Sequence, residues 1–232
     1  MWLRNERFQR LGGGFGERFA NAVLSQLQLF MLGAHKDPAI VQLVRRVRKE
    51  RKSLLTAFES FFLFTTARSQ RDRPGHMAEV GVFAGASSKL ICEARGTATL
   101  HLFDTFEGLP ESSDKDRTIY RGKNRQYACS LESVQAYLQG YSDVHFYKGF
   151  FPDTAGPVQD CTFSFVHLDV DLYESTLACL KFFYPRLNPG GVLLSHDYSL
   201  LAGVRAAFDE FLADKPEGLI ESPTTQCLFV KR

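Results

Sequence analysis

The sequence lacks paired cysteines. Its five cysteines, in 232 residues, are scattered along the chain and form no Cys-X-X-Cys pair. An odd and unpatterned set argues against a disulfide framework and against a zinc site. We therefore expect reduced thiols and a cytoplasmic location.

The sequence also lacks a large charge excess and a long apolar run. A net charge of +2 gives the whole chain no reason to bind nucleic acid. Charged residues close to Met1 argue against a signal peptide. The apolar stretch 19–34 is too short, and too often interrupted by polar residues, to span a membrane. The basic run Arg45–Lys52 fits phosphate contacts, although we favour a solvated helix face or an oligomer contact.

The first 75 residues are predicted to be a helical extension. Apolar residues recur at helical spacing within 24–31 and again within 41–58. The loop Ser69–Gly75, which contains Pro and Gly, ends this pattern. We expect residues 1–75 and a core of residues 76–232 to form one domain, with a homo-oligomer contact through the first helices.

From residue 76 onward, apolar runs alternate with helical patterns, which predicts a parallel sheet with helices on both faces. The predicted strands are Met77–Phe83, Thr99–Phe103, Val144–Tyr147, Phe163–Leu168 and Val192–Leu194. The predicted helices are Ser87–Glu93, Leu131–Leu138, Tyr173–Tyr184 and Val204–Leu212.

The C-terminal segment predicts an antiparallel hairpin. Leu219–Glu221 and Gln226–Val230 flank a short turn, with no helix between them. The expected fold is thus α/β and Rossmann-like, with a mostly parallel seven-stranded sheet finished by the hairpin. A dinucleotide dehydrogenase fits less well, because it usually continues with further βα units and carries Gly-X-Gly-X-X-Gly.

The segment Ala78–Ser87 runs from a strand through a glycine turn into a helix. Gly81 would let a ligand lie against the main chain, and the helix N-terminus with Ser87 offers donors to a carboxylate. Glu79 suits a cationic amine better than a pyrophosphate. Glycine turns after strands are common, so this segment alone is a weak signal.

Asp104 ends the next strand, at about the 20-residue offset where an acid bonds a ribose diol in nucleotide sites. The alternative is that Asp104 caps a turn. Together with the glycine turn, it favours an adenosine-containing ligand. The polar stretch Thr105–Gln126 is expected to be a lid or a binding loop.

Acidic residues mark the ends of the fourth and fifth strands. Asp169 and Asp171 point the same way in an extended segment, and adjacent carboxylates need a cation, a shared proton or strong donors. The alternative is that one of them, chiefly Asp171, caps the following helix. Asp197 can converge with Asp169 on one cation such as Mg²⁺. His196 beside it is either a third ligand or a hydrogen-bonding wall residue.

Six segments closely resemble, in this order, the macrocin O-methyltransferase (TylF-type) family: EVGVFAGAS, FDTFEGLP, KGFFPDT, LDVDLYEST, NPGGVLLSHDY and GVRAAFDEF. The resemblance runs from about Leu43 to the C-terminus, and the combination is specific. It implies a class I methyltransferase fold, S-adenosylmethionine as cofactor and a divalent metal, usually Mg²⁺. The implied acceptor is a hydroxyl, with a sugar on a natural product or a glycan as the expected class.

The resemblance also implies roles for individual residues. The cofactor-binding positions are Glu79, Gly81 and Ser87 at the methionine end, Asp104 at the ribose, Gly149 and Phe150 near the adenine, and Ser53 at a helical position that closes over the methionine. The metal ligands are Asp169, Asp197 and, where the family commonly has another acid, His196. Asp171 resembles the general base, which takes the hydroxyl proton.

Two other functions stay open from the sequence. Because His196 replaces an acid, the chain can also be a metal-independent methyltransferase for another small molecule. A non-catalytic protein that binds nucleotides, or nucleic acid through Arg45–Lys52, is the alternative from a different class.

Overall fold

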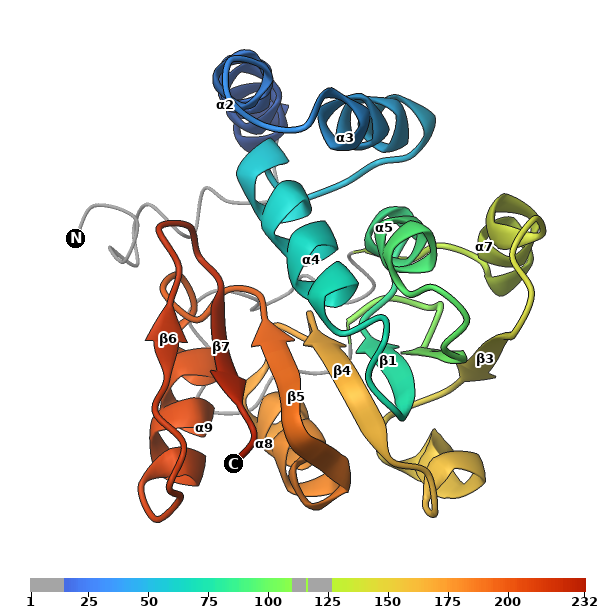
Figure 1. Cartoon of the computed structure of the whole chain (residues 1–232), viewed down its shortest axis with the longest axis vertical. Helices are drawn as coiled ribbons and strands as arrows, with labels where there is room; N and C mark the ends of the chain where they lie inside the picture. Colours follow the sequence, from blue (N-terminus) through green and yellow to red (C-terminus); the bar gives the residue numbers. More distant parts are fainter. Residues whose placement is uncertain (1–14, 110–115, 117–126) are drawn as a thin grey trace.

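The structure is a computed structural model that describes residues 15–109, 116 and 127–232. Within these residues, seven strands form one sheet in the order β3-β2-β1-β4-β5-β7-β6, with helices on both faces (Figure 1). Strands β1 to β5 are parallel, and β7 pairs antiparallel with both β5 and β6. The predicted seven-stranded, Rossmann-like sheet with its terminal hairpin is confirmed.

The elements of the described chain follow the predicted alternation. The strands are β1 (His76–Val80), β2 (Leu100–Asp104), β3 (Val144–Lys148), β4 (Phe163–Leu168), β5 (Leu187–Ser195), β6 (Ile220–Glu221) and β7 (Cys227–Val230). The helices are α2 (Phe15–Gly33), α3 (Pro38–Glu50), α4 (Ala57–Ser69), α5 (Ala86–Ala94), α7 (Leu131–Leu138), α8 (Tyr173–Phe183) and α9 (Ala202–Leu212), with short 3₁₀ turns η1 (Asp153–Val158) and η2 (Tyr184–Arg186).

The first predicted strand is too long at its end. β1 stops at Val80 rather than at Phe83, because Gly81 has φ +90° and Phe83 has φ +48°, so the chain turns there. The fifth predicted strand is too short, since β5 already begins at Leu187.

The helical pattern of residues 41–58 is not one helix. α3 ends at Glu50, and α4 begins at Ala57 after a non-helical link. Thr56 and Glu59 form a capping box, in which each side chain accepts the backbone N–H of the other residue. This cap fixes the start of α4 and the direction in which Glu59 points.

Apolar side chains on the two faces of the sheet form two cores, as the alternation of side chains along a strand requires. Met77 and Leu102 pack in the core that includes α3, α4 and α5. Val80 and Phe103 pack in the core that includes α8 and α9. The three layers leave the carboxyl ends of β1, β4 and β5 side by side at one edge of the sheet (Figure 1).

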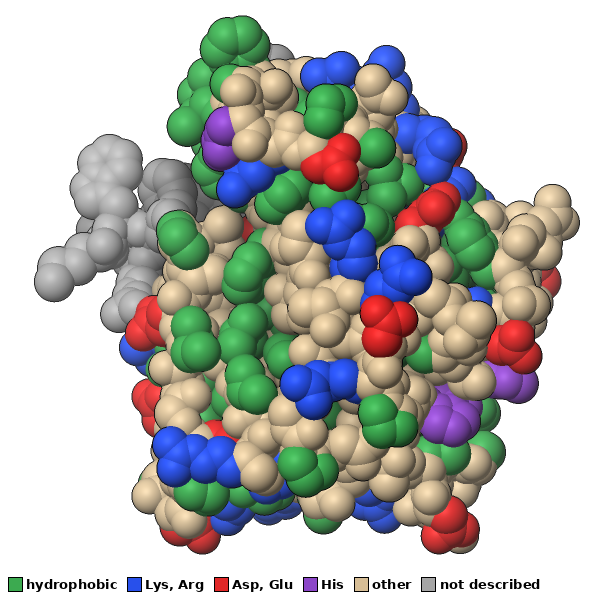
Figure 2. Space-filling model, viewed as in Figure 1, with side chains coloured by type: hydrophobic (Ala, Val, Ile, Leu, Met, Phe, Trp, Pro, Cys, Tyr) green, Lys and Arg blue, Asp and Glu red, His purple; other side chains and the backbone are tan. Residues whose placement is uncertain are grey.

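The helices α2 and α3 lie beyond α4, away from the sheet (Figure 1). Leu29 and Leu32 of α2 are buried against this layer. The opposite side of α2 exposes five large apolar side chains, Val23, Leu24, Leu27, Phe30 and Met31. Figure 2 shows hydrophobic side chains gathered over α2 at the top of the view. Among the described residues, no helix has the length and apolar content needed to cross a membrane.

Candidate functional site at the carboxyl ends of three strands

The ends of β1, β4 and β5 bring the predicted acids together. Beyond the strands, the Asp169 N–H donates to the Val80 carbonyl at 2.9 Å, and the His196 N–H donates to the Leu168 carbonyl at 2.8 Å. These bonds hold the residues after β4 and β5 at the edge where open parallel sheets place their ligands.

His196 lies between the two acids that the sequence assigns to a metal. Its Nδ1 is 3.2 Å from Asp169 Oδ1 and 3.1 Å from Asp197 Oδ2. Asp171 lies close enough to Asp197 for the two carboxyl groups to interact. Asp171 and Asp197 both have φ +61°, a left-handed conformation that few residues other than Gly, Asn and Asp adopt. Backbone strain of this kind is concentrated at functional sites.

A fourth acid, Glu59 of α4, faces the other side of the imidazole. Its Oε2 is 3.4 Å from His196 Nε2, and its Oε1 accepts the Thr225 hydroxyl at 2.7 Å from the turn between β6 and β7. Sequence reasoning missed Glu59. The spacing of Thr56 and Glu59 signals a helix start, but no local pattern shows that this carboxylate meets His196.

The carboxylates around this one imidazole give the cluster an excess of negative charge. Although burial opposes the change, Asp197, Asp169 and Glu59 raise the pKa of His196 well above its usual value. Burial, together with Asp197 and Asp169, raises the pKa of Asp171 well above its usual value. The cluster therefore favours a bound positive charge, which is either a proton on His196 or a metal cation.

The cluster fits a divalent cation. Asp169, His196 and Asp197 each offer a ligand atom, and these atoms lie within 4.8 Å of one another. The buried Nδ1 of His196 makes no hydrogen bond of good geometry within the described chain. Glu59 faces the other ring nitrogen, as carboxylates commonly do behind metal-binding histidines. An imidazole among the oxygen ligands suits Mn²⁺, Fe²⁺ or Zn²⁺ at least as well as Mg²⁺.

Gly81 is required by the protein's own backbone. A Cβ at this position would lie 1.9 Å from the carbonyl oxygen of Asp169. From the sequence, we expected Gly81 to allow a ligand to approach the main chain. In the structure, the group nearest to an added Cβ is the backbone of Asp169. Gly85, with φ +79°, then starts α5, and Ser87 is buried in the first turn of that helix.

Asp104 organises the glycine turn. Its Oδ2 accepts the N–H groups of Val82 and Phe83 at 2.7 and 2.9 Å. Its Oδ1 accepts the Phe106 N–H at 2.6 Å. The alternative that Asp104 caps a turn is therefore observed. The Thr105 hydroxyl is a further, longer contact, 3.5 Å from Oδ1.

Glu79 lies beneath the glycine turn, inside the layer between the sheet and α5. It is fully buried. Its Oε1 is 2.9 Å from His167 Nδ1 on β4, and its Oε2 accepts the hydroxyl of Ser88. Any effect of Glu79 on a ligand would therefore pass through the residues that cover it.

Three other predicted cofactor residues lie on different segments. The Gly149 N–H donates to the Asp104 carbonyl at 3.0 Å, which places Gly149 beside the end of β2. Phe150 follows with an exposed side chain. Ser53 is not helical, contrary to the prediction, because it lies in the link between α3 and α4.

An open hollow lies beside the glycine turn. Its volume is about 320 Å³, near the lower end of small-ligand sites. The residues that line it are Glu50, Arg51, Lys52, Phe83, Ala84, Ala128 and Cys129. Phe83 and Ala84 belong to the glycine turn, Glu50 to Lys52 lie within the basic run, and Ala128 and Cys129 precede α7.

The predicted lid Thr105–Gln126 lies largely outside the described residues. Asp116 is described and buried, and its Oδ1 and Oδ2 are 3.0 and 3.2 Å from the Tyr173 nitrogen. The Tyr173 N–H at the start of α8 thus donates to Asp116. Asp171 therefore does not cap α8, contrary to the alternative considered from the sequence, and its carboxylate belongs to the acid cluster.

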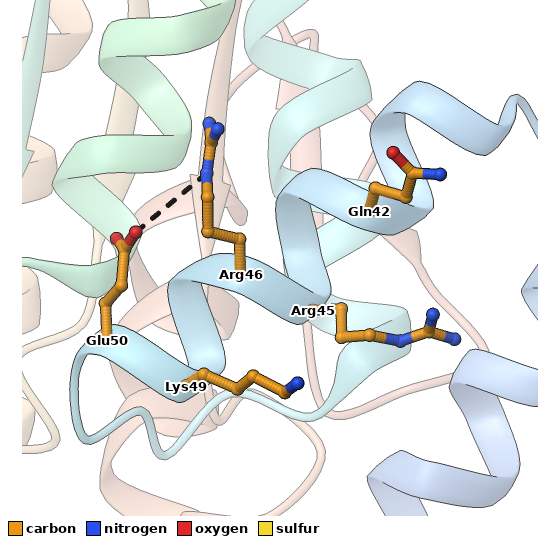
Figure 3. Close-up of a pocket in the computed structure, with 5 residues that line it drawn as sticks. All are labelled: Gln42, Arg45, Arg46, Lys49 and Glu50. Carbon is orange, nitrogen blue, oxygen red and sulfur yellow. Dashed lines mark ion pairs between the residues drawn. The ribbon is translucent and has the colours of Figure 1, made fainter.

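The basic run Arg45–Lys52 is divided among several roles. Figure 3 shows Arg46 reaching toward Glu50, 4.0 Å away, while a second ion pair of 3.1 Å joins Arg46 to a glutamate of α5. Arg48 and Arg51 donate to main-chain carbonyls of other segments. These contacts engage Arg46, Arg48 and Arg51 within the protein itself.

Comparisons of the sequence identify relatives. The family model for Macrocin-O-methyltransferase (TylF) matches residues 64–226. The 8-demethyl-8-(2,3-dimethoxy-alpha-L-rhamnosyl)-tetracenomycin-C 4'-O-methyltransferase of Streptomyces olivaceus is 33% identical in an alignment of 150 residues that covers 59% of this chain and 58% of that protein. Demethyldecarbamoylnovobiocin O-methyltransferase of Streptomyces niveus is 30% identical in an alignment of 158 residues that covers 60% of this chain and 59% of that protein. The alignments thus span less than two thirds of these relatives.

Solved structures share the fold. The O-methyltransferase NovP superposes with a TM-score of 0.68 at 25% identity, over 77% of this chain and 81% of NovP. The calicheamicin methyltransferase CalS11 superposes with a TM-score of 0.63 at 20% identity, over 84% and 94% of the two chains. Because the family match covers well over half of the sequence, this chain belongs to the TylF family of macrocin O-methyltransferases.

Proposed function

We propose that this chain is an S-adenosylmethionine-dependent O-methyltransferase that acts on a hydroxyl of a sugar carried by a natural product or a glycan. One observation carries the proposal: the glycine turn after β1 lies against the acids after β4 and β5. The two features are in direct backbone contact at Gly81 and Asp169. Family membership supports the reaction, and a relative named as a rhamnosyl-tetracenomycin 4'-O-methyltransferase supports the acceptor class.

The cofactor is assigned to the glycine turn and the adjoining strand ends, where the first N–H groups of α5 can bind a carboxylate. The assigned residues are Gly81 and Ser87 at the methionine end, Asp104 at the ribose, Gly149 and Phe150 at the adenine, Glu79 beneath the turn and Ser53 in the α3–α4 link. When bound, the cofactor supplies an electrophilic methyl group.

Asp169, His196 and Asp197 are assigned as the ligands of a divalent cation, with Mg²⁺ and Mn²⁺ as the leading candidates. A cation there would lower the pKa of an acceptor hydroxyl. Glu59 would keep the proton on Nε2 of His196 and orient the ring, so that Nδ1 is free to bind. The donor set supports this assignment, as does the position of Nδ1, which lies close to Asp169 and Asp197 without a hydrogen bond of good geometry.

Asp171 is assigned as the general base that takes the acceptor's proton. It lies two residues after Asp169 and interacts with Asp197, so it borders the proposed cation position. The pKa of Asp171 is raised by burial and by these carboxylates, which makes it a stronger base than an exposed aspartate.

The base assignment is tested with Asp171→Asn, since Asn keeps the size of Asp and its tolerance of positive φ. We expect kcat to fall on the order of 10²- to 10⁴-fold, the usual contribution of general-base catalysis, with S-adenosylhomocysteine affinity unchanged by calorimetry. The matched control is Asp143→Asn, at an exposed aspartate with φ +53°. Full activity of Asp171→Asn refutes the assignment, and loss of cofactor affinity assigns Asp171 a structural role instead.

The metal assignment is tested by chelation. We expect a chelator to abolish methyl transfer and either Mg²⁺ or Mn²⁺ to restore it, with Mn²⁺ effective at the lower concentration because of the imidazole ligand. Activity that is indifferent to the chelator would make protonated His196 the resident positive charge and refute the metal role.

A second copy of this chain is the proposed partner of α2. Residues 19–33 of this helix carry no charged side chain, so two copies of its apolar face would meet without a charge conflict. A cytoplasmic location is also proposed, because all five cysteines are free thiols.

A further inference from the structure

A second cluster of metal-binding side chains lies at the amino ends of the parallel strands, opposite the acid cluster. His76 is the first residue of β1, His101 is near the start of β2, and Cys161 lies just before β4. A five-residue strand is about 15 Å long, so this cluster is separated from the acids at the carboxyl ends by most of a strand length.

The ligand atoms of these three residues already converge. His76 Nδ1 and His101 Nε2 are 2.7 Å apart, and with the Cys161 sulfur all three ligand atoms lie within 4.8 Å of one another. A tetrahedral zinc ion, with bonds of about 2.0–2.1 Å to nitrogen and 2.3 Å to sulfur, needs its ligand atoms between three and four ångströms apart. Small side-chain movements therefore suffice to admit the ion.

Tyr147 orients the central imidazole. Its hydroxyl is 2.9 Å from His101 Nδ1, so a proton on Nδ1 can be donated to Tyr147 while the lone pair of Nε2 faces His76. Binding histidines usually make such a contact through their second nitrogen.

We propose that His76, His101 and Cys161 form a binding site for Zn²⁺, with water completing a tetrahedral set. Two imidazoles and a thiolate select a thiophilic cation and disfavour Mg²⁺. A bound ion would join β1, β2 and the segment before β4, so its expected effect is on stability. The cysteine spacing that argued against a zinc site in the sequence misses this arrangement, because its ligands come from three separate segments. The simpler alternative is a hydrogen bond between two imidazoles with no metal.

Cobalt substitution distinguishes these alternatives and separates this site from the acid cluster, which contains no sulfur. Because the acid cluster also offers ligands, we titrate Co²⁺ to two equivalents and expect a thiolate charge-transfer band in reduced, metal-free protein. The band should disappear in Cys161→Ser and remain in Cys129→Ser, another partly exposed cysteine. It should also remain in Asp169→Asn. Absence of the band in the wild type, or its persistence in Cys161→Ser, overturns the proposal.

Affinity and stability give second readouts. Tyr147→Phe keeps the ring that stacks on Phe103 and should weaken Co²⁺ affinity about 10- to 100-fold without removing the band. The stability test uses the Asp169→Asn variant, in which the acid cluster lacks one ligand. In this variant, Zn²⁺ at a hundredfold excess over its Kd should raise Tm by about 5–10 °C, and adding Cys161→Ser should abolish that rise. An unchanged Tm, with Cys161→Ser folded by circular dichroism, also overturns the proposal.

Discussion

Gly81→Ala tests whether the glycine turn is shaped by the protein's own backbone or by a ligand. The added Cβ would lie 1.9 Å from the Asp169 carbonyl oxygen, more than 1 Å short of the 3.0 Å below which such contacts essentially do not occur. The end of β4 must therefore move by about that distance. Overpacking costs about 1–3 kcal/mol, and the left-handed φ of +90° adds about 1–2 kcal/mol for a residue with a Cβ.

We expect the ligand-free variant to lose about 2–5 kcal/mol, which lowers Tm by roughly 5–15 °C in a chain of this size. The displacement of Asp169 should also cost about 10²-fold in kcat/KM. Differential scanning calorimetry without cofactor measures the first effect. Gly140→Ala is the matched control, because nothing lies within 4 Å of the added Cβ. If ligand-free Gly81→Ala melts with the wild type and only cofactor affinity falls, the glycine serves the ligand and this reasoning is wrong.

The contacts of α4 and α2 give two further predictions. Glu59→Gln removes a buried charge that faces His196, and we expect it to lose about 2–3 kcal/mol at neutral pH in urea unfolding. Although burial opposes the change, His196 and hydrogen bonds lower the pKa of Glu59 in the folded protein. The stability that Glu59 contributes is therefore fully present above a pH of about 4.3, the pKa of an unfolded glutamate, and is lost as the pH falls further. The unfolding free energies of the wild type and the variant should converge in acid, and a difference that stays constant with pH would contradict this account. The double variant Leu27→Glu, Phe30→Glu places two charges on the apolar face of α2 and should convert an oligomer to a monomer in light scattering. The control Ile220→Glu changes an exposed apolar side chain on β6 and should leave the oligomer intact. A monomeric wild type would exclude the proposed α2 contact.

The order of the elements was predictable because it depends on local patterns. Alternating apolar runs and helical periods are properties of short segments, and the hairpin Leu219–Val230 followed from the absence of a helix between two strands. The boundaries that failed depend on contacts made elsewhere. β1 ends at Val80 because Gly81 meets the backbone after β4, and this contact leaves no mark in the sequence of β1 itself.

The residues of the candidate site that follow strands were predictable in the same way, and those from other segments were not. Asp169, Asp171 and Asp197 could be grouped because parallel strands end at one edge. Glu59 could not be added, since it reaches the site from a helix outside the strand–helix alternation. Asp116 was equally hidden, because its contact with the start of α8 comes from a polar stretch of sequence with no periodicity.

The position of His196 among three carboxylates can be explained by counting the charges. Without a metal, Asp169, Asp197 and Glu59 surround a protonated imidazole, which leaves two negative charges in excess. A divalent cation that displaces the Nδ1 proton leaves a single negative charge in excess, and Asp171 can then lose its proton without exceeding the original imbalance. Metal binding should therefore release protons, one from His196 and part of another from Asp171. Calorimetric titration of the metal in buffers of different ionisation enthalpy measures this release. Binding without proton release would show that His196 is neutral before the metal arrives and that the charge count is wrong.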